Sequence, residues 1–400
     1  MKTRSRWTLA AFLTLTLAAL PGTASAQSPS DCLVGPSTAA TLLFPYFEVD
    51  LSNVDGITTL LSINSGVSGS SLSRVVVWTD RGIPVLAFDI FLSAFDVQTI
   101  NLRSVLEGNI PSTGAGEDLS SFGFCGLFPP NHINPVLEPA EISQLRADLT
   151  GVQGPNFVDC AGTAFGDNRA RGYVTVDVVQ ECSGVESGVP AFTPARTSTD
   201  FPYFEDGSGN SVAIDANILW GDVVTVDFAG NAAQGSEAVA VYSDPNNRNS
   251  PDSFTFYGRF FNWDARDHRV PLPATWNQRY LNGGPFAGGA DLTVWRDPGV
   301  PVDPFTCGTV AAPFPLGDVS FYFDEEGNFV LPGSSANFPL STQRVSIDDL
   351  SVPFDFGWIQ IETSPTGQAW VQPTLQASGR FSAALNGTPI FTLCEADPTP

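Results

Sequence analysis

The chain has 400 residues, of which 42 are acidic and 18 are basic, and its formal net charge at pH 7 is −24. A surface of this sign repels phosphate backbones and anionic lipids, so we expect neither nucleic acid nor a membrane surface as a partner. Cations, glycans and other proteins remain as partner classes.

Residues 1–26 have the three regions of a secretory signal peptide. A basic start over residues 2–6 precedes an apolar stretch over 7–20, and the small residues 24–26 form a cleavage site. The apolar stretch is shorter than the roughly 20 residues that a bilayer span needs. We therefore predict cleavage after Ala26 and a mature chain without a membrane span. Such a chain is secreted, held at the cell surface or kept in the periplasm.

All six cysteines follow this segment. Because an exported chain meets an oxidising compartment, their even number favours disulfide bonds. A zinc site is disfavoured, since there is no C-x-x-C motif and the chain has only two histidines. Sequence alone leaves the pairing open, and we chose pairs that join the ends of neighbouring strands or the two sides of one excursion. The predicted pairs are Cys32 with Cys182, Cys125 with Cys160, and Cys307 with Cys394.

Short β-branched and aromatic segments between Gly, Pro and Asp turns predict strands in the first half. Leu72–Asp80, Ile83–Leu92 and Asp96–Leu102 are interpreted as a meander, and Tyr173–Val179 is a further strand. We take residues 27–200 as an N-terminal β-sandwich.

One helix is predicted within this half, over Pro139–Leu149, with proline in its first turn and Gly151 as its stop. It lies in a Gly- and Pro-rich excursion over residues 108–172. Long loops inside compact domains are often functional, so a binding surface is expected there first.

The second half continues the strand pattern, and we take residues 201–400 as a C-terminal β-sandwich. Its predicted strands are Val223–Phe228, Ala238–Tyr242, Ser253–Phe261, Leu292–Trp295, Val319–Phe323, Trp358–Glu362, Gln368–Gln372, Gly379–Leu385 and Ile390–Leu393.

Two internal matches indicate a duplication. Phe44–Glu48 recurs identically as Phe201–Glu205, and six of nine positions agree between Val77–Val85 and Val294–Val302. The alternative is that strand-turn-strand units converge on the same turn chemistry.

These patterns predict an all-β protein of two β-sandwich domains, immunoglobulin-like or jelly-roll-like, with one short helix in a long excursion. Residues 72–102 resemble the immunoglobulin-like sandwich modules of exported bacterial proteins in their strand, Asp-x-Gly turn and Pro-Val strand. The resemblance implies a fold and no activity.

No catalytic constellation is recognisable in the sequence. There is no G-x-S-x-G nucleophile elbow, and His132 and His268 lie in turn-like segments. Paired carboxylates of a glycoside hydrolase cannot be located among 42 acids. Five tryptophans are candidates for stacking on sugars, with core packing as the alternative; these are Trp220, Trp263, Trp276, Trp358 and Trp370.

Calcium is the one metal that the composition suggests, because carboxylate and amide oxygens are abundant. Three loops qualify loosely, although none completes a calcium-loop pattern, and ordinary Asx turns explain them as well. No other cofactor is predicted. The candidate ligands are Asp206, Ser208 and Asn210, then Asp244 and Asn246, then Asp324 and Glu326.

The sequence therefore favours a secreted or surface-associated, non-enzymatic β-sandwich protein with a binding or structural role. The alternative is an extracellular carbohydrate-binding protein or glycoside hydrolase, with calcium as a possible requirement. The partner in either case is an extracellular glycan or protein.

Overall fold

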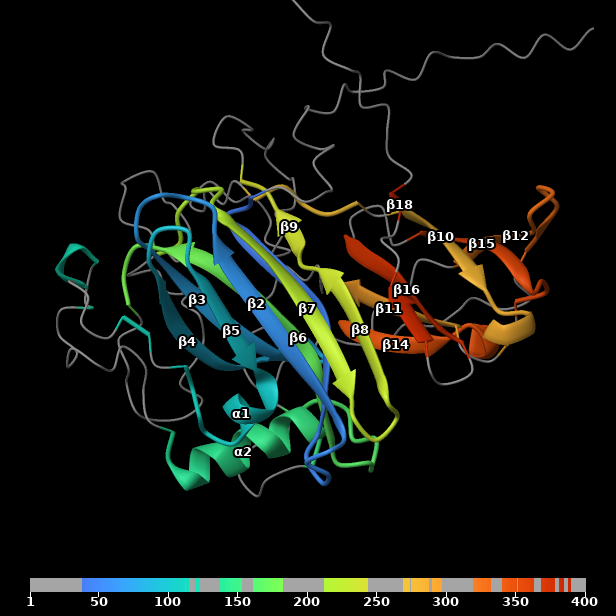
Figure 1. Ribbon diagram of the computed structural model, residues 1–400. Coiled ribbons are helices and arrows are strands. Elements are labelled where there is room, and N and C mark those ends of the chain that lie inside the picture. Colours follow the sequence, from blue (N-terminus) through green and yellow to red (C-terminus); the bar gives the residue numbers. More distant parts are fainter. Residues whose placement is uncertain are drawn as a thin grey trace, which may run out of the picture.

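The fold is described from a computed structural model of the 400-residue chain (Figure 1). The described residues are 38–111, 113–114, 119–122, 125, 137–152, 161–182, 212–243, 269–273, 275–287, 290–296, 319–331, 340–350, 352–362, 368–377, 381–384 and 388–389.

The first pair of sheets is formed mainly by the N-terminal half, and every strand pairing in it is antiparallel. The β1 sheet has the order β4-β3-β6-β1-β9, and the β2 sheet has the order β5-β2-β7-β8. Their strands are β1 (Thr41–Asp50), β2 (Ile57–Ser65), β3 (Ser71–Thr79), β4 (Pro84–Leu92), β5 (Val97–Asn101), β6 (Arg169–Val179), β7 (Leu219–Asp227), β8 (Ala232–Glu237) and β9 (Val239–Val241).

The second pair of sheets follows in the chain and is also antiparallel. The β11 sheet has the order β14-β11-β16-β17, and the β10 sheet has the order β13-β12-β15-β10-β18. Their strands are β10 (Thr275–Leu281), β11 (Ala290–Arg296), β12 (Val319–Phe323), β13 (Phe329–Val330), β14 (Thr342–Ser346), β15 (Phe356–Glu362), β16 (Ala369–Ala377), β17 (Phe381–Ala384) and β18 (Thr388–Pro389).

The predicted all-β, sandwich-like fold class is confirmed, and so is the predicted helix. The helix α2 spans Pro139–Thr150, and Gly151 ends it in the left-handed conformation with φ 69°. A shorter helix, α1 (Leu102–Leu106), lies beside it at one end of the first two sheets (Figure 1).

Two predictions about strand arrangement differ from the structure. The predicted meander is wrong in its third strand, because β5 pairs with β2 in the opposite sheet and not with β4. The connection that crosses between the sheets passes through Phe95, whose φ is 54°. In addition, β7 pairs with β2, β8 pairs with β7, and β9 pairs with β1, so the sheets do not divide at residue 200.

The β1 sheet is buried on both faces. All nine residues of β3 are buried, including the continuous apolar run Val75–Trp78. One face packs against the β2 sheet, and the other belongs to a core that continues into the second pair of sheets. Trp78 stacks on Tyr173 at 5.5 Å, and Tyr173 meets Trp295 edge-on at 5.9 Å, so aromatic rings join the two halves.

The described disulfide corrects two predicted cysteine pairs. Cys125 is bonded to Cys182, with the two Cα atoms 5.0 Å apart, and not to Cys160. The reason is that the segment with Cys125 folds back onto the end of β6, where Cys182 lies next to Glu181. Cys32, Cys160, Cys307 and Cys394 lie outside the described residues.

The proposed duplication stays a prediction. Val77–Thr79 ends β3 and Val294–Arg296 ends β11, and both strands are central in their sheets. The remainder of the second nine-residue copy, and Phe201–Glu205, lie outside the described residues.

Candidate functional site

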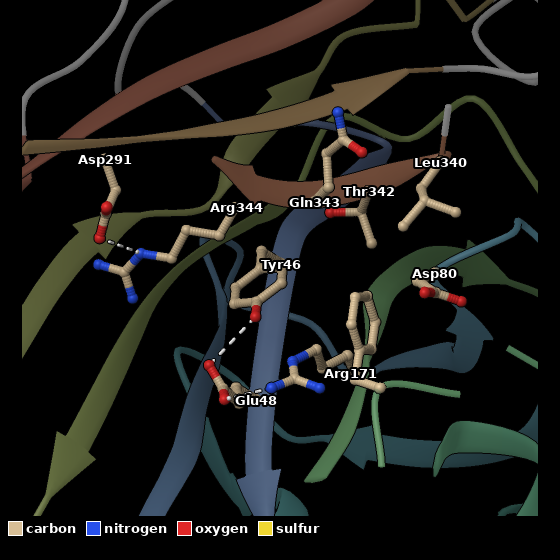
Figure 2. Close-up of a pocket in the computed structure, with 10 residues that line it drawn as sticks. Tyr46, Glu48, Asp80, Arg171, Asp291, Leu340, Thr342, Gln343 and Arg344 are labelled. Atoms are coloured by element: carbon tan, nitrogen blue, oxygen red, sulfur yellow. Dashed lines mark hydrogen bonds and ion pairs between the residues drawn. The ribbon is translucent and has the colours of Figure 1, made fainter. Parts of the chain in front are cut away.

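A cavity of about 330 Å³ lies between the two pairs of sheets (Figure 2). We call it the inter-sandwich cavity. One wall comes from β1, β6 and the turn after β3, and the other comes from β11 and β14. The lining residues are Tyr46, Glu48, Asp80, Phe165, Arg171, Asp291, Leu340, Thr342, Gln343 and Arg344.

An irregularity in β1 turns Tyr46 and Glu48 toward this cavity. The pairing of β1 with β6 shifts register between Phe44 and Phe47, next to Pro45, which has no N–H to donate. As a result Phe44 and Phe47, three residues apart, both pack into the core facing the β2 sheet. A regular strand would place Phe44, Tyr46 and Glu48 on one face.

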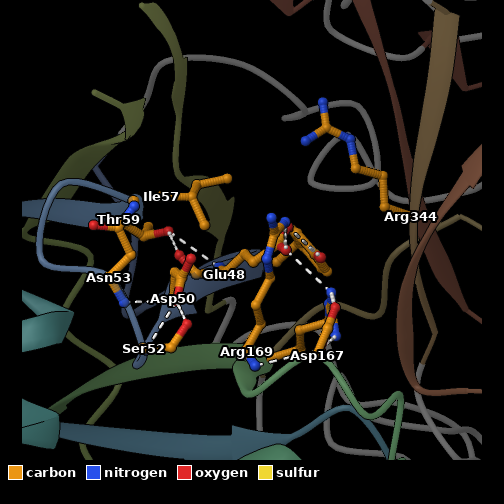
Figure 3. A network of polar contacts seen from close by, with 12 residues as sticks. Glu48, Asp50, Ser52, Asn53, Ile57, Thr59, Asp167, Arg169 and Arg344 are labelled. Atoms are coloured by element: carbon orange, nitrogen blue, oxygen red, sulfur yellow. Dashed lines mark hydrogen bonds and ion pairs between the residues drawn. The ribbon is translucent and has the colours of Figure 1, made fainter. Parts of the chain in front are cut away.

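Glu48 is the centre of a charged network on the first wall (Figure 3). Its Oε1 is 2.8 Å from the Arg169 guanidinium and 3.1 Å from that of Arg171, and Arg171 also pairs with Asp167. The Tyr46 hydroxyl donates to Glu48 Oε2 at 3.1 Å. Burial, followed by the nearby Glu48 charge, raises the pKa of Tyr46 far above its usual value. The phenol therefore stays a neutral donor.

The opposite wall carries a second ion pair. Arg344 Nε lies 3.1 Å from Asp291 Oδ2, and a terminal guanidinium nitrogen of Arg344 donates to Gln234 Oε1 at 3.3 Å. Burial raises the pKa of Asp291, and Arg344 opposes that effect. The two walls are joined where the Thr342 N–H donates to the Asp80 carbonyl at 3.1 Å and the Thr342 hydroxyl donates to the carbonyl of Pro45.

Two buried polar groups at the cavity keep unused hydrogen-bonding capacity. Asp80 is 2% exposed; its Oδ1 accepts a hydrogen bond from the Thr163 N–H at 2.9 Å, whereas its Oδ2 has no partner among the described residues. Gln343 is 9% exposed, and within the same described part its Nε2 has no partner either. Burial raises the pKa of Asp80, although the hydrogen bonds from Thr163 oppose this. An acceptor and a donor are thus left for a further molecule.

Phe165 adds an apolar surface to this polar cavity. Its ring is about half exposed, and the Arg171 guanidinium lies over it at 4.6 Å from the ring centre. Both residues belong to the excursion over residues 108–172 in which we expected a binding surface.

The predicted calcium ligands are not brought together in the described part of the chain. Asp324 and Glu326 lie in the hairpin turn between β12 and β13, where the Asp324 carboxylate accepts from the backbone of Glu326 and Asn328 and from the Asn328 side chain. These bonds make an Asx turn and lower the pKa of Asp324. Among the described residues no three His, Cys, Asp or Glu side chains form a metal-binding group. Asp206, Ser208, Asn210, Asp244, Asn246, His132 and His268 lie outside them.

The tryptophans named as sugar-stacking candidates lie elsewhere. Trp276 and Trp370 are buried and pack against each other at 4.8 Å, as the core alternative requires. Trp358 stacks on Phe323 at 3.6 Å, and Trp220 is about half exposed on β7. Trp263 is not among the described residues.

The sequence did not identify the lining of the inter-sandwich cavity. The Phe44–Glu48 segment stands out in the sequence as a repeat, and its proline inside an apolar strand is the one local signal for a bulge. Asp291 and Arg344 carry no local signal, since their pairing depends on the register of β11 with β14.

Fold and site together define the class as a β-sandwich protein with a polar cavity between its sandwiches. Comparison with known proteins adds nothing further, because no protein family, no curated protein and no solved structure matches the chain. None of the helices in the described part has the length and apolar character to cross a bilayer.

Proposed function

We propose that this chain is an exported, non-enzymatic binding protein that holds a neutral, polyhydroxylated molecule, a saccharide, in the inter-sandwich cavity. The observation that carries the proposal is that Glu48 and Asp291 already have arginine partners, whereas Asp80 and Gln343 each keep an unused hydrogen-bonding atom. Glu48 is paired with Arg171 and Asp291 with Arg344, so a charged ligand would have to displace an existing partner.

The two groups with unused hydrogen-bonding atoms are suited to bind the hydroxyls of a saccharide. The Gln343 amide offers an N–H, and Asp80 Oδ2 offers an acceptor, within a cavity that also presents the ring of Phe165. Polar ligand sites combine an apolar surface with a few placed donors and acceptors, and a sugar has a hydroxyl edge and an apolar ring face. Export is supported by the signal-peptide pattern over residues 1–26 and by the disulfide between Cys125 and Cys182.

The test is isothermal titration calorimetry with glucose, galactose, mannose, N-acetylglucosamine and their disaccharides. At least one saccharide is expected to bind, and Gln343→Ala is expected to weaken it about fivefold, which corresponds to about 1 kcal/mol for one neutral hydrogen bond. Gln98→Ala, on the edge strand β5, is the matched control and should leave affinity unchanged. Equal weakening by both variants, or no binding across the panel, would refute the proposal.

A second candidate, a glycoside hydrolase, is favoured by one observation. Burial raises the pKa of Asp80, which suits a general acid, and a second acidic residue, Glu48, lines the same cavity and pairs with Arg169 and Arg171. Mass spectrometry of the bound disaccharide after incubation distinguishes a binding protein from a hydrolase. The non-enzymatic proposal predicts that the disaccharide is recovered intact, and release of monosaccharide abolished by Asp80→Asn would support the hydrolase.

A further inference from the structure

A second cavity lies at the far end of the β1 sheet and differs in chemistry from the first. It encloses about 450 Å³ between the start of β3, the end of β6 and the short 3-10 helix Leu119–Ser121. We call it the Glu181 cavity. Its lining mixes polar and apolar groups, and the partly exposed apolar side chains in it are Phe122, Ile214 and Ile218.

The Glu181 carboxylate is the unbalanced group in this lining. Burial raises the pKa of Glu181, and no described residue donates a hydrogen bond to its carboxylate or forms an ion pair with it. The Arg74 charge opposes this effect and the Asp89 charge adds to it, but the Arg74 guanidinium bonds to other groups: its Nε pairs with Asp89 at 3.0 Å, and a terminal nitrogen donates to the backbone carbonyl of Glu181 at 3.2 Å. A partly buried carboxylate without a partner costs free energy that a cation in the cavity would offset.

A hydroxyl in the same lining also lacks a partner among the described residues. Ser71 is 4% exposed and lines the cavity, and no described group forms a hydrogen bond with its Oγ. A primary ammonium has three N–H donors and no acceptor, so it matches a carboxylate and a hydroxyl together.

The apolar wall of the cavity is fixed covalently. Cys182, next to Glu181, is bonded to Cys125, and this bond holds the segment that carries Phe122 against the end of β6. The Phe122 ring also packs edge-on against Phe91 at 6.0 Å. A wall that is already in place lowers the ordering cost of binding.

We propose that the Glu181 cavity binds a primary alkyl ammonium, with the Glu181 carboxylate as counter-ion, Ser71 Oγ as an acceptor and the alkyl chain against Phe122, Ile214 and Ile218. This site is separate from the inter-sandwich cavity and does not depend on the function proposed for it.

The probes are hexylammonium, hexan-1-ol, hexanoate and trimethylhexylammonium, titrated into the full chain by calorimetry. Hexylammonium is expected to bind about tenfold more tightly than hexan-1-ol, as for a charge-assisted hydrogen bond, and hexanoate should not bind. Trimethylhexylammonium has no N–H to donate and is expected to bind several-fold more weakly than hexylammonium. Equal binding of the amine and the alcohol, or of the two cations, would overturn the proposal.

Two variants distinguish this site from the general negative charge of the protein. Glu181→Gln is expected to weaken hexylammonium about tenfold, to the level of the alcohol. Glu237→Gln removes one carboxylate from the exposed strand β8 and should change affinity less than twofold. Equal losses in both variants would show non-specific attraction and overturn the proposal. If Glu181→Gln does not fold, the comparison of the four probes on the wild-type chain still tests whether the cavity binds a primary ammonium.

Discussion

Replacing Glu48 by glutamine should destabilise the protein moderately, by an amount that the geometry of the network sets. Glu48 is 6% exposed, and its carboxylate accepts hydrogen bonds from Arg169, from Arg171 and from the Tyr46 hydroxyl. Glutamine keeps one oxygen for the arginines, and its NH₂ can donate to the Tyr46 oxygen, so shape is kept and only the charge is lost. Arg169 is 42% exposed and Arg171 retains Asp167, which limits the loss.

We expect Glu48→Gln to lower the free energy of unfolding by about 1–2 kcal/mol. Glu48→Ala should lower it by about 3 kcal/mol, because it removes the acceptor of the buried Tyr46 phenol and one of the two carboxylates that pair with Arg171. The assay is urea unfolding at pH 7, followed by tryptophan fluorescence. Glu237→Gln, on exposed β8, is the control and should stay within about 0.5 kcal/mol of wild type. The reasoning is refuted if Glu48→Gln matches this control, or if it is as damaging as alanine.

Three further predictions concern stability. Burial raises the pKa of Asp148 to about 6, so the wild-type protein loses stability as the pH rises from about 4 through 6. Asp148→Asn should therefore be more stable than wild type at about pH 7 and as stable as wild type near pH 4. A stability gain of the same size at both pH values would contradict this. Replacing both Cys125 and Cys182 by serine opens a loop with a sequence separation of 57 and should cost about 4 kcal/mol in urea unfolding, whereas a cost below about 1 kcal/mol would argue against the bond. A Cβ on Gly172 would lie 1.9 Å from a backbone oxygen, so Gly172→Ala should lower the free energy of unfolding by more than about 3 kcal/mol. Gly69 has open space around it, so Gly69→Ala should leave stability nearly unchanged. Similar melting temperatures for the two variants would contradict the packing.

Local signals account for what the sequence predicted well. Pro139 and Gly151 fix the ends of α2 through their own backbone preferences, which do not depend on distant contacts. The β-branched run of Val223–Phe228 likewise became part of β7. Its placement did not follow from the sequence, because the choice of sheet depends on long-range pairing with β2.

Buried charge explains why the sites themselves were missed. Arg74 and Asp89 face each other across β3 and β4 inside a buried sheet, yet in sequence they look like the polar positions of a half-exposed strand. The lining of the inter-sandwich cavity comes from positions as far apart as Tyr46 and Arg344. Only the packing of one pair of sheets on the other brings such residues together.

The most direct test of the central claim is hydrogen-exchange mass spectrometry with and without the tightest-binding saccharide. We predict added protection in β1 around Tyr46 and in β14 over Thr342–Ser346, the two walls of the inter-sandwich cavity. Protection confined to the open face of the β2 sheet around the half-exposed Trp220, or no change in either wall, would contradict the account.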